Sequence, residues 1–438
     1  MIVASAWAGK HYAVLGLARS GAAAVRALLA GGARVTAWDT DAAKRDAILA
    51  GPPPQAELGE DLVIADLDTI DLADVDALVV SPGVPLNRHP LAAKARAAGV
   101  PIVGDIELFA QARAGLPAHK VVGITGTNGK STTTALVHHI LTTAGTRARM
   151  GGNIGLPILA QKPLEAGGVY VLELSSYQID LTQTLDCDVA VLLNVTPDHL
   201  DRYDGFEGYA ASKARLFAMQ SPAHLAVVDY EAEAELGVLD GAPAGLNVRF
   251  IDGVPLPGDQ ARWPSLQGPH NEQNAKAAVA VAEALGVPAE TIERALESFT
   301  GLPHRMERIA TLNGVAWIND SKATNPESAA PALAAFPRIH WIVGGKAKGD
   351  DLDACAPYLD HVVRAYTIGD SGPRFAAVLR GHMPVAEVET LERAVKLAAQ
   401  EAERGDVVLL SPAAASFDQF TDFEHRGQVF RALVEQMA

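Results

Sequence analysis

The chain is built from short apolar runs, rich in valine, isoleucine and leucine, that end in polar or glycine-containing turns. Runs of this length are typical of strands buried on both faces of a parallel sheet. Segments with helical character, several of them rich in alanine, follow many of these turns, and this alternation predicts an α/β protein. Strands are expected at residues 11–15, 34–39, 76–80, 121–124, 170–174, 188–195, 315–320, 339–343, 362–368 and 407–410, and helices from residue 131, over 209–217 and 275–285, and from about 422 to 437.

The first two expected strands form a βαβ opening of the dinucleotide-binding type, with Asp39 near the end of the second strand. The glycine fingerprint is incomplete, because Ala18 stands between Gly16 and Gly21 where the middle glycine belongs. That glycine lets a backbone approach a pyrophosphate closely, so the sequence disfavours NAD and leaves a different nucleotide, or none. The later turn at residues 81–83, Ser-Pro-Gly, is on local grounds an ordinary turn.

The strongest local signal is the strand 121–124, which is followed by Gly-Thr-Asn-Gly-Lys-Ser-Thr at 126–132 and by the start of a helix. This is the architecture of a phosphate-binding loop, in which backbone N–H groups and a helix N-terminus face phosphate oxygens. Lys130 would reach the terminal phosphates, and the Ser131 hydroxyl would hold Mg²⁺. The general pattern wants a glycine where Ile124 stands, and a structural turn is the alternative interpretation.

Polar residues near the following strands are candidates for chemistry. Glu173 lies in an apolar strand, where a carboxylate costs free energy unless it is paired or binds metal, and Mg²⁺ ligation is favoured over a buried salt bridge. His199, between two aspartates, is either a metal ligand or structural. Lys213 lies on an expected helix, and its local sequence indicates a solvated surface position. Asn271 and Asn274 either cap the next helix or bond an adenine or phosphate.

The last third of the chain repeats the alternation of strands and helices. Three of its expected strands end in residues with hydroxyl groups, lysine or glycine, at 321–325, 344–348 and 411–416. In α/β sheets such ends face the ligand crevice. Together these groups would suit a carboxylate-bearing substrate.

Length, charge and cysteine content set outer limits. The 438 residues allow roughly two to four domains. A formal net charge of −16 disfavours nucleic acid and anionic membranes as partners. No run is long enough to span a membrane, and the N-terminus does not resemble a signal peptide. Cys187 and Cys355 do not form a disulfide framework, so we expect both to be packing residues in a cytoplasmic protein.

Taken together, these motifs resemble the Mur ligase family of bacterial peptidoglycan synthesis over nearly the whole chain. The motifs that carry the resemblance are at residues 126–132, 151–155, 173–178, 194–203, 270–274 and 301–305. Two C-terminal motifs, at 319–325 and 410–420, are similar to the branch that adds D-glutamate to UDP-N-acetylmuramoyl-L-alanine. The resemblance implies a ligase that forms an amide through an acyl phosphate and a tetrahedral intermediate, with ATP converted to ADP and phosphate.

The resemblance also implies three domains. These are a Rossmann-like N-terminal domain for the UDP substrate (1–107), a central P-loop ATPase-type α/β domain (108–302), and a Rossmann-like C-terminal domain that binds the amino acid and closes on ATP (303–438). The implied partners are UDP-N-acetylmuramoyl-L-alanine, D-glutamate, ATP and two Mg²⁺ ions. We expect a monomer that neither binds nucleic acid nor inserts into a membrane.

Site residues follow from the same resemblance. Lys130, His199 and Lys213 match catalytic positions, and Lys213 matches a lysine that is carbamylated in the family and helps to hold the second Mg²⁺. The metal positions are Ser131, Glu173, His199 and Lys213. The ATP positions are Gly126, Thr127, Asn128, Gly129, Lys130, Ser131, Thr132, Asn274, Arg305 and Asp320. The positions around the UDP substrate are Leu17, Ala18, Ser81, Gly83 and Asn153, and those around D-glutamate are Thr324, Lys348, Ser416 and Phe423.

Three rival interpretations come from other classes. A folylpolyglutamate synthase-like ligase would share the ATPase core, but it gives no reason for the N-terminal domain or for residues 321–325. A nucleotide switch would need the phosphate loop but not three clusters of polar strand ends. An NAD-dependent oxidoreductase is opposed by Ala18. ATP turnover that depends on a uridine substrate separates all three from the main interpretation.

Overall fold

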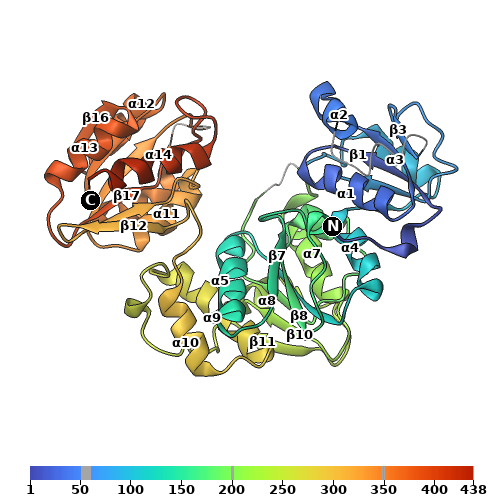
Figure 1. Cartoon of the computed structure of the whole chain (residues 1–438). Helices are drawn as coiled ribbons and strands as arrows, with labels where there is room; N and C mark the ends of the chain where they lie inside the picture. Colours follow the sequence, from blue (N-terminus) through green and yellow to red (C-terminus); the bar gives the residue numbers. More distant parts are fainter. Residues whose placement is uncertain (51–60, 199–201, 348, 350, 438) are drawn as a thin grey trace. The chain divides into compact units, whose positions relative to one another are not determined.

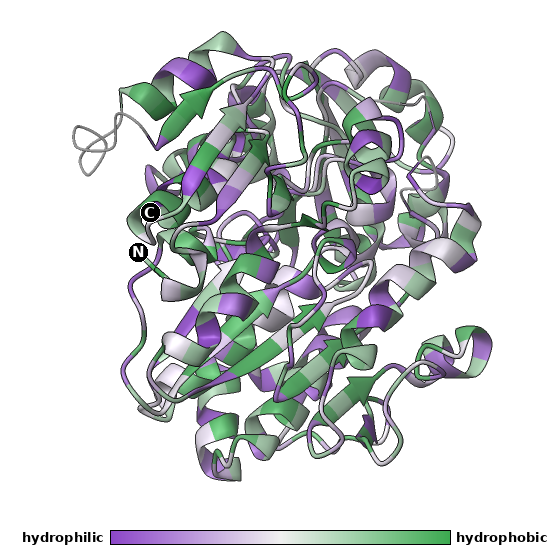
Figure 2. Cartoon of the chain, turned by 90° about the vertical axis from the view of Figure 1, so that its right-hand side faces the viewer, coloured by the Kyte–Doolittle hydropathy of each residue, from purple (hydrophilic) through white to green (hydrophobic). Residues whose placement is uncertain are grey.

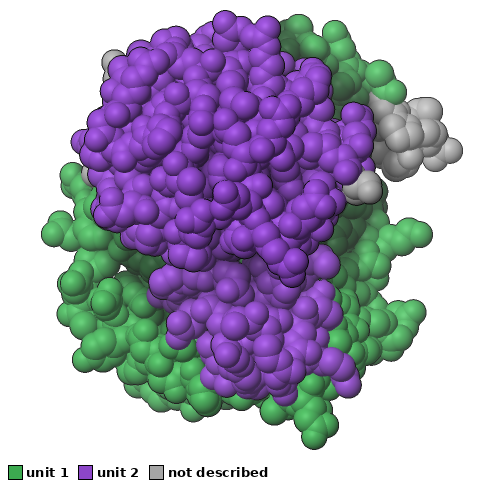
Figure 3. Space-filling view, turned by 90° about the vertical axis from the view of Figure 1, so that its left-hand side faces the viewer, with its two compact units in different colours: residues 1–255, 276–291 green, residues 256–275, 292–438 purple. Residues whose placement is uncertain are grey.

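The computed structural model describes residues 1–50, 61–198, 202–347, 349 and 351–437. These residues form three sheets with helices packed on them, as the sequence predicted (Figure 1). The chain divides into two compact units, Met1–Pro255 with Lys276–Thr291 and Leu256–Ala275 with Ile292–Ala438, which Figure 3 shows in separate colours. The domain boundaries given above remain a prediction.

The first sheet has the strand order β3-β2-β1-β4-β5, and its paired strands are parallel. β1 pairs with β2 from His11↔Arg34 to Leu15↔Trp38, which confirms the predicted βαβ opening. Its elements are β1 (His11–Leu15), α1 (Arg19–Ala30), β2 (Arg34–Trp38), α2 (Ala42–Leu49), β3 (Leu62–Ile64), β4 (Ala77–Val80), α3 (Pro90–Ala97) and β5 (Ile102–Val103), and α4 (Asp105–Ala112) follows.

The second sheet has the order β11-β10-β9-β6-β8-β7, again with parallel pairs. β6 lies between β8 and β9, so the loops after these three strands meet at one edge, where α/β proteins bind ligands. Its elements are β6 (His119–Thr125), α5 (Lys130–Thr143), β7 (Ala148–Gly152), β8 (Gly168–Glu173), α6 (Ser176–Asp180), β9 (Val189–Leu192), α7 (Gly205–Ala218), β10 (Leu225–Val228), α8 (Tyr230–Leu236) and β11 (Asn247–Phe250).

The third sheet has the order β12-β13-β17-β14-β15-β16, in which only the β12–β13 pair is antiparallel. The edge strands β12 and β16 were not predicted. Its elements are β12 (Glu307–Leu312), β13 (Val315–Asn319), α11 (Pro326–Ala334), β14 (Ile339–Gly344), β15 (Val362–Ile368), α12 (Gly372–Leu379), β16 (Val385–Glu389), α13 (Leu391–Glu401), β17 (Val407–Leu410) and α14 (Phe423–Glu435).

The helix expected to begin near Ala275 begins earlier. α9 covers Pro269–Ala284, and α10 (Ala289–Ser298) follows it. Proline suits the first helical turn because its missing N–H has no partner to lose there. Asn271 and Asn274 therefore lie inside the helix, and the prediction that one of them caps it is wrong. Instead Asn274 Nδ2 donates to Asn271 Oδ1 at 3.1 Å, and both side chains are buried.

The strands owe their stability to apolar burial, and hydropathy along them can be followed in Figure 2. Cys187 and Cys355 are free thiols with no exposed surface, which confirms their predicted packing role. Burial raises the pKa of each thiol to about 12, so neither is a ready nucleophile. Over the described ranges, every helix is too short or too polar to cross a bilayer.

Candidate active site

The phosphate loop joins β6 to α5 through two glycines with positive φ. Gly126 has φ 152° and Gly129 has φ 82°, and a side chain at either position would strain the turn. The left-handed conformation of Gly129 starts α5 at Lys130. The loop therefore leads directly into a helix N-terminus, where N–H groups and the helix dipole attract phosphate. The local architecture predicted for residues 121–132 is confirmed.

A second loop, after β9, holds the phosphate loop in shape. Asn194 Oδ1 accepts a hydrogen bond from the N–H of Asn128 at 2.9 Å, and its carbonyl accepts one from the N–H of Thr127 at 3.0 Å. Thr127 Oγ1 in turn accepts from the N–H of Thr196 at 3.0 Å. These bonds hold the phosphate loop against the loop after β9. Asn194 was missed as a site residue, although an amide at the end of a buried strand was a visible signal.

Two lysines from different helices meet at one carbonyl of this loop. Lys130 Nζ and Lys213 Nζ each donate to the oxygen of Gly126, both at 2.9 Å. Lys213 also lies over the ring of Tyr209, with 4.5 Å from Nζ to the ring centroid. Only 1% of Lys213 is exposed, so the local interpretation as a solvated surface residue is wrong.

The environment of Lys213 disfavours its charge. Burial, with a further contribution from the positive charge of Lys130, lowers the pKa of Lys213 to about 7, while Asp198 and Asp180 act in the opposite direction. A substantial fraction of this amine is therefore neutral at neutral pH. A neutral buried amine can act as a nucleophile, which a surface lysine cannot do at this pH.

Glu173 ends β8 beside the phosphate loop, since it pairs with Ile124 across the β6–β8 ladder. Its Oε1 accepts from Asn153 Nδ2 at 2.9 Å, whereas Oε2 is buried and no group in the described part of the chain donates to it. Within that part Glu173 also makes no ion pair, which speaks against the buried salt bridge. An orphaned carboxylate oxygen beside the strand that leads into a phosphate loop fits Mg²⁺.

The other predicted metal ligands have less structural support than Glu173. His199 lies outside the described residues. Across the residues that are described, no three histidine, cysteine, aspartate or glutamate side chains gather into a metal site. A metal would therefore take ligands from Ser131, Glu173, phosphate oxygens, His199 or a modified Lys213.

A cavity of about 630 Å³ in unit 1 lies at the carboxyl ends of the strands of the first sheet. Ala18, Ser81, Gly83 and Asn153, which the resemblance assigns to the UDP substrate, line it, while the side chain of Leu17 is buried away from the lining. Gly152, Gly155, Pro157 and Gln178 of the central domain complete the wall. Ala18 has φ −66° and therefore adopts a backbone conformation open to any residue, so the missing glycine costs no strain here.

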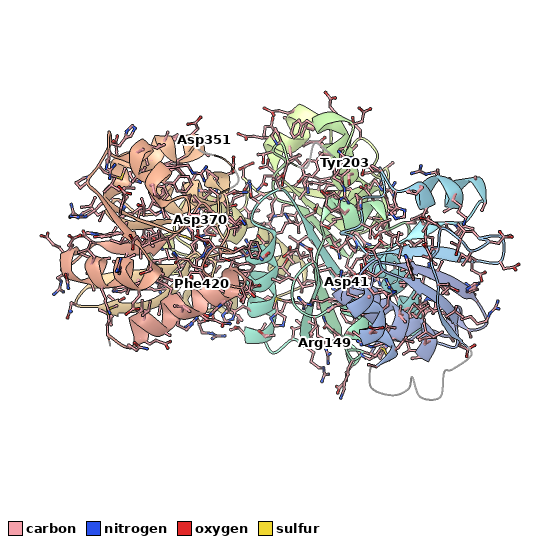
Figure 4. All side chains as sticks on the ribbon, turned by 90° about the horizontal axis from the view of Figure 1, so that it is seen from above. Asp41, Arg149, Tyr203, Asp351, Asp370 and Phe420 are labelled. Atoms are coloured by element: carbon pink, nitrogen blue, oxygen red, sulfur yellow. The ribbon has the colours of Figure 1, made fainter. Side chains whose placement is uncertain are left out.

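Asp39 lines this cavity and fixes the backbone beside it through two hydrogen bonds. Its carboxylate accepts from the N–H of Leu17 at 2.8 Å and from the N–H of Asp41 at 3.0 Å. Burial opposes its ionisation, but these backbone bonds and Lys44 outweigh burial and lower the pKa. Asp41, labelled in Figure 4, caps α2 by accepting from the N–H of Ala43 at 2.9 Å. The sequence marked Asp39 only as the acidic end of a strand.

The C-terminal candidates lie in unit 2, at the ends of β13 and β17. Asp320 accepts from Ser411 Oγ at 2.8 Å and from the N–H of Met306 at 3.2 Å, so it ties the segment next to Arg305 to both strands. Burial raises the pKa of Asp320 to about 7, against the opposing effects of Ser411, Met306 and nearby arginines.

The four residues assigned to the amino acid are placed as follows. Thr324 is half-buried in the loop after β13, and Ser416 is buried in the segment after β17. Phe423 opens α14, where Lys322 Nζ lies 4.8 Å from its ring centroid. Lys348 lies outside the described residues.

Family models match three consecutive parts of the chain. The model described as "Mur ligase MurD-like, N-terminal domain" matches residues 10–104, "Mur ligase middle domain" matches 124–244, and "Mur ligase, glutamate ligase domain" matches 304–414. The chain belongs to the Mur ligase family. The first and last matched ranges contain the first and third sheets, and the middle range contains β7 to β10 of the second sheet, so the family assignment and the three-sheet fold agree.

Curated relatives cover the whole of this Mur ligase. A UDP-N-acetylmuramoylalanine–D-glutamate ligase of Novosphingobium aromaticivorans is 62% identical over 440 residues, which is 100% of this chain and 97% of the relative. Proteins of the same name from Sphingopyxis alaskensis and Zymomonas mobilis are 56% and 55% identical and are matched over the full length of both chains.

Solved Mur ligases share the fold of this one. The MurF ligase of Thermotoga maritima, in complex with ADP, aligns over 100% of this chain and 98% of its own, with a TM-score of 0.59 and 17% identity. The UDP-N-acetylmuramate-alanine ligase MurC of the same organism aligns over 98% of this chain and 100% of its own, with a TM-score of 0.56 and 18% identity. At such identities the likeness is one of fold alone.

Proposed function

We propose that this Mur ligase joins D-glutamate to UDP-N-acetylmuramoyl-L-alanine and converts ATP to ADP and phosphate. The full-length relatives carry this activity in their name, and the family uses ATP and Mg²⁺. The observation that carries the proposal in the structure is the meeting of Lys130 and Lys213 at the Gly126 carbonyl, beside an orphaned Glu173 oxygen. Such a site is suited to transfer a phosphoryl group between two anions.

In the first step a substrate carboxylate oxygen attacks the γ-phosphorus of ATP. A bond forms between that oxygen and phosphorus, the bond to the bridging oxygen breaks, and ADP leaves. The N–H groups of the phosphate loop and Lys130 hold the triphosphate in line for this attack. Ser131 and Glu173 would hold Mg²⁺, which supplies positive charge that offsets the repulsion between carboxylate and triphosphate.

In the second step the amine of D-glutamate attacks the acyl phosphate carbon. The tetrahedral intermediate collapses, the C–O bond to phosphate breaks, and the amine loses a proton as the amide forms. Thr324, Ser416 and Phe423, together with Lys348, would surround the amino acid. Arg305, Asp320 and Asn274 would complete the ATP site.

Lys213 is proposed to be carbamylated. Its neutral amine would attack CO₂, forming an N–C bond and losing a proton, and the resulting carbamate would offer oxygen ligands to a second Mg²⁺ together with His199. Burial and the lowered pKa support this, because they keep the lone pair available at neutral pH. A cationic lysine has no lone pair to offer to a metal.

The cavity at the first sheet is the proposed site of the UDP substrate. The helix N-terminus of α1 opens onto it through Ala18 and Arg19, and a helix N-terminus favours a diphosphate. Asn153 contacts both this cavity and Glu173, so it links substrate binding to the phosphate-transfer site. We further propose that the enzyme works as a cytoplasmic monomer with the three domains 1–107, 108–302 and 303–438.

The decisive experiment measures phosphate release from ATP and Mg²⁺ with UDP-N-acetylmuramoyl-L-alanine. D-glutamate, L-glutamate, L-lysine and meso-diaminopimelate are offered separately. Release with D-glutamate alone supports the proposal in full. Release with another amino acid would keep the ligase and change its acceptor, and no release with any of the four would overturn the proposed function.

A further inference from the structure

Arg426 on α14 is a buried cation that the reaction described above does not use. Only 1% of the residue is exposed. Its guanidinium donates three hydrogen bonds: Nε to Ser321 Oγ at 2.9 Å, Nη2 to the carbonyl of Ser321 at 2.8 Å, and Nη1 to the carbonyl of Ala414 at 3.0 Å. All three acceptors are neutral oxygens.

The charge of Arg426 therefore has no direct counter-ion. In the described ranges no carboxylate lies within ion-pair distance of the guanidinium, and Asp418 and Asp320 act on it only from farther away. Burial lowers the pKa of Arg426 to about 10, which leaves it charged at neutral pH. A buried charge without an ionic partner is costly to keep, and such a cost is offset when an anion binds nearby.

The guanidinium of Arg426 lies close to the ends of three strands of the third sheet. Ser321 follows β13 and Ala414 follows β17, and Nη1 would lie 3.1 Å from a Cβ built on Gly345, which follows β14. The guanidinium thus lies under three strand ends that meet at the ligand edge of the third sheet. Ser321 Oγ also donates to the carbonyl of Phe423 at 2.9 Å, which joins the first turn of α14 to the same network.

Three of the four proposed amino-acid contacts are close in sequence to Arg426 or to one of its hydrogen-bond partners. Thr324 follows Ser321 by three residues, Ser416 follows Ala414 by two, and Phe423 precedes Arg426 by one helical turn. Bonds from one guanidinium therefore fix the backbone that presents all three. A planar fork with several donors can do this, whereas an ammonium group cannot reach the same acceptors together.

We propose that Arg426 is the residue that positions the amino-acid pocket and gives it a fixed positive charge, and that it thereby selects an acidic amino acid over a neutral one of the same shape. This inference rests on the proposed function. It assigns Arg426 a role through the loops and through its electric field, without contact with the substrate. A purely structural cross-link would hold the loops but would not discriminate between glutamate and glutamine.

The test compares Arg426→Met, which removes the charge, with Arg426→Lys, which keeps it and loses the fork. The KM for D-glutamate and the inhibition constant of D-glutamine are measured for each. Arg426→Met is expected to raise the KM for D-glutamate by about 30-fold and to change the D-glutamine constant by less than about 5-fold. Arg426→Lys is expected to weaken both ligands by a similar factor of about 5. Equal weakening of both ligands in Arg426→Met, or no weakening, would overturn the proposal.

Two additions keep the test interpretable. Ser321→Ala removes one acceptor but leaves the charge, so both ligands should weaken alike by about 3-fold, and an unchanged KM for D-glutamate would refute the positioning role even if Arg426→Met fails to fold. Arg393→Met is the matched control, because Arg393 pairs with Glu389 at 2.7 Å on an exposed surface of the same domain, and it should leave both constants unchanged.

Hydroxylamine separates this inference from the proposed function. With ATP and the UDP substrate but no amino acid, hydroxylamine traps the acyl phosphate as a hydroxamate. Wild-type enzyme and Arg426→Met should form it at the same rate. If the wild type forms none, the proposed function fails, and the inference with it. If the wild type forms it and Arg426→Met does not, Arg426 acts in the phosphoryl step and the inference alone is overturned.

Discussion

Lys213 in the central domain and Arg426 in the C-terminal domain are both cations with 1% of their surface exposed, yet burial has different consequences for them. Each donates to backbone carbonyls, Lys213 to Gly126 and Arg426 to Ser321 and Ala414. Burial lowers the pKa of the lysine to about 7 and that of the arginine only to about 10. At neutral pH the first group is therefore partly neutral, and the second remains charged.

The difference lies in the chemistry of the two side chains. The ammonium group of Lys213 carries a localised charge, so burial beside the positive charge of Lys130 displaces its proton and frees a lone pair. A guanidinium spreads its charge over three nitrogens and stays protonated in the same surroundings. The same desolvation thus leaves a partly neutral amine in one domain and a permanent charge in the other. An arginine at position 213 should therefore abolish the proposed modification, whereas a lysine at position 426 should weaken the pocket by losing the guanidinium fork.

The largest expected effect is at Lys213. Lys213→Ala removes the amine that would be carbamylated, and turnover should fall by roughly a thousandfold or more, equivalent to about 4 kcal/mol of transition-state stabilisation. A small carboxylate such as acetate should restore part of the activity in the vacated space. Lys213→Arg fills that space with a group that keeps its proton, so it should be inactive and acetate should not help.

Phosphate release with both substrates measures these effects. The matched control is Lys120→Ala, since Lys120 is exposed on β6 of the same sheet. A wild-type rate in Lys213→Ala would refute the carbamate. Acetate rescue of Lys213→Arg would refute the argument from protonation.

The two cations also illustrate what a sequence can and cannot predict. Apolar runs predicted β1, β6, β8, β9 and β17, because a strand that is buried on both faces consists of consecutive apolar residues. The phosphate loop and the unusual position of Glu173 could be recognised for the same reason. Two glycines after a strand, or a carboxylate within an apolar run, stand out in the local sequence. Ser131 was assigned to Mg²⁺ from the phosphate-loop motif, whereas Asn153 was reached only through the family resemblance, and both assignments stay predictions.

Lys213 could not be placed from its own helix. Only its immediate neighbours in the sequence are small or polar, whereas Tyr209, Leu216 and Phe217 share its helix face and are buried. The carbonyl that accepts from its amine belongs to the loop after β6, which is far away in the sequence. Arg426 was missed for a similar reason, because its partners are backbone oxygens that any residue supplies. β16 was missed because its exposed, alternating residues lack the apolar run of a central strand. α9 begins early because Pro269 favours a first turn.

Glu173 supplies the next test, because it is a buried anion in the same site as Lys213. Glu173→Gln keeps the shape and the bond to Asn153 but removes the charge on the orphaned Oε2. Turnover should fall by about a hundredfold to a thousandfold, and part of the loss should be recovered at high Mg²⁺ because the affinity for the metal is what has weakened. The Mg²⁺ dependence of phosphate release measures this, with the exposed Glu165→Gln as the control. An unchanged Mg²⁺ dependence would assign Glu173 to structure alone.

The smallest effect concerns Asp320, an anion in the domain that holds Arg426. Its pKa is about 7 in the folded protein because of burial, whereas an unfolded chain ionises it near pH 4. Between these values only the unfolded state gives up the proton, so the folded state loses stability as pH rises through this window and loses no more above it. Asp320→Asn has no such proton, and the decline in its free energy of unfolding from pH 4 to pH 7 should be smaller by about 2–4 kcal/mol.

Urea unfolding of the wild type and Asp320→Asn at several pH values measures this difference, and Asp370→Asn, at an exposed position labelled in Figure 4, is the control. The direction in which the free energy of unfolding changes with pH distinguishes Asp320 from Lys213. Lys213 has a lowered pKa, so its burial penalty is relieved as pH rises from about 7 toward its unfolded value, which is the opposite trend in a higher window. The loss of stability between pH 4 and pH 7 should disappear in Asp320→Asn and persist in Lys213→Ala. That result would assign this lower pH window to Asp320 in the C-terminal domain and leave the window above pH 7 to Lys213 in the central domain. An identical decline in Asp320→Asn and the wild type would show that Asp320 is ionised in the folded state, and would place a counter-charge close to Arg426 after all.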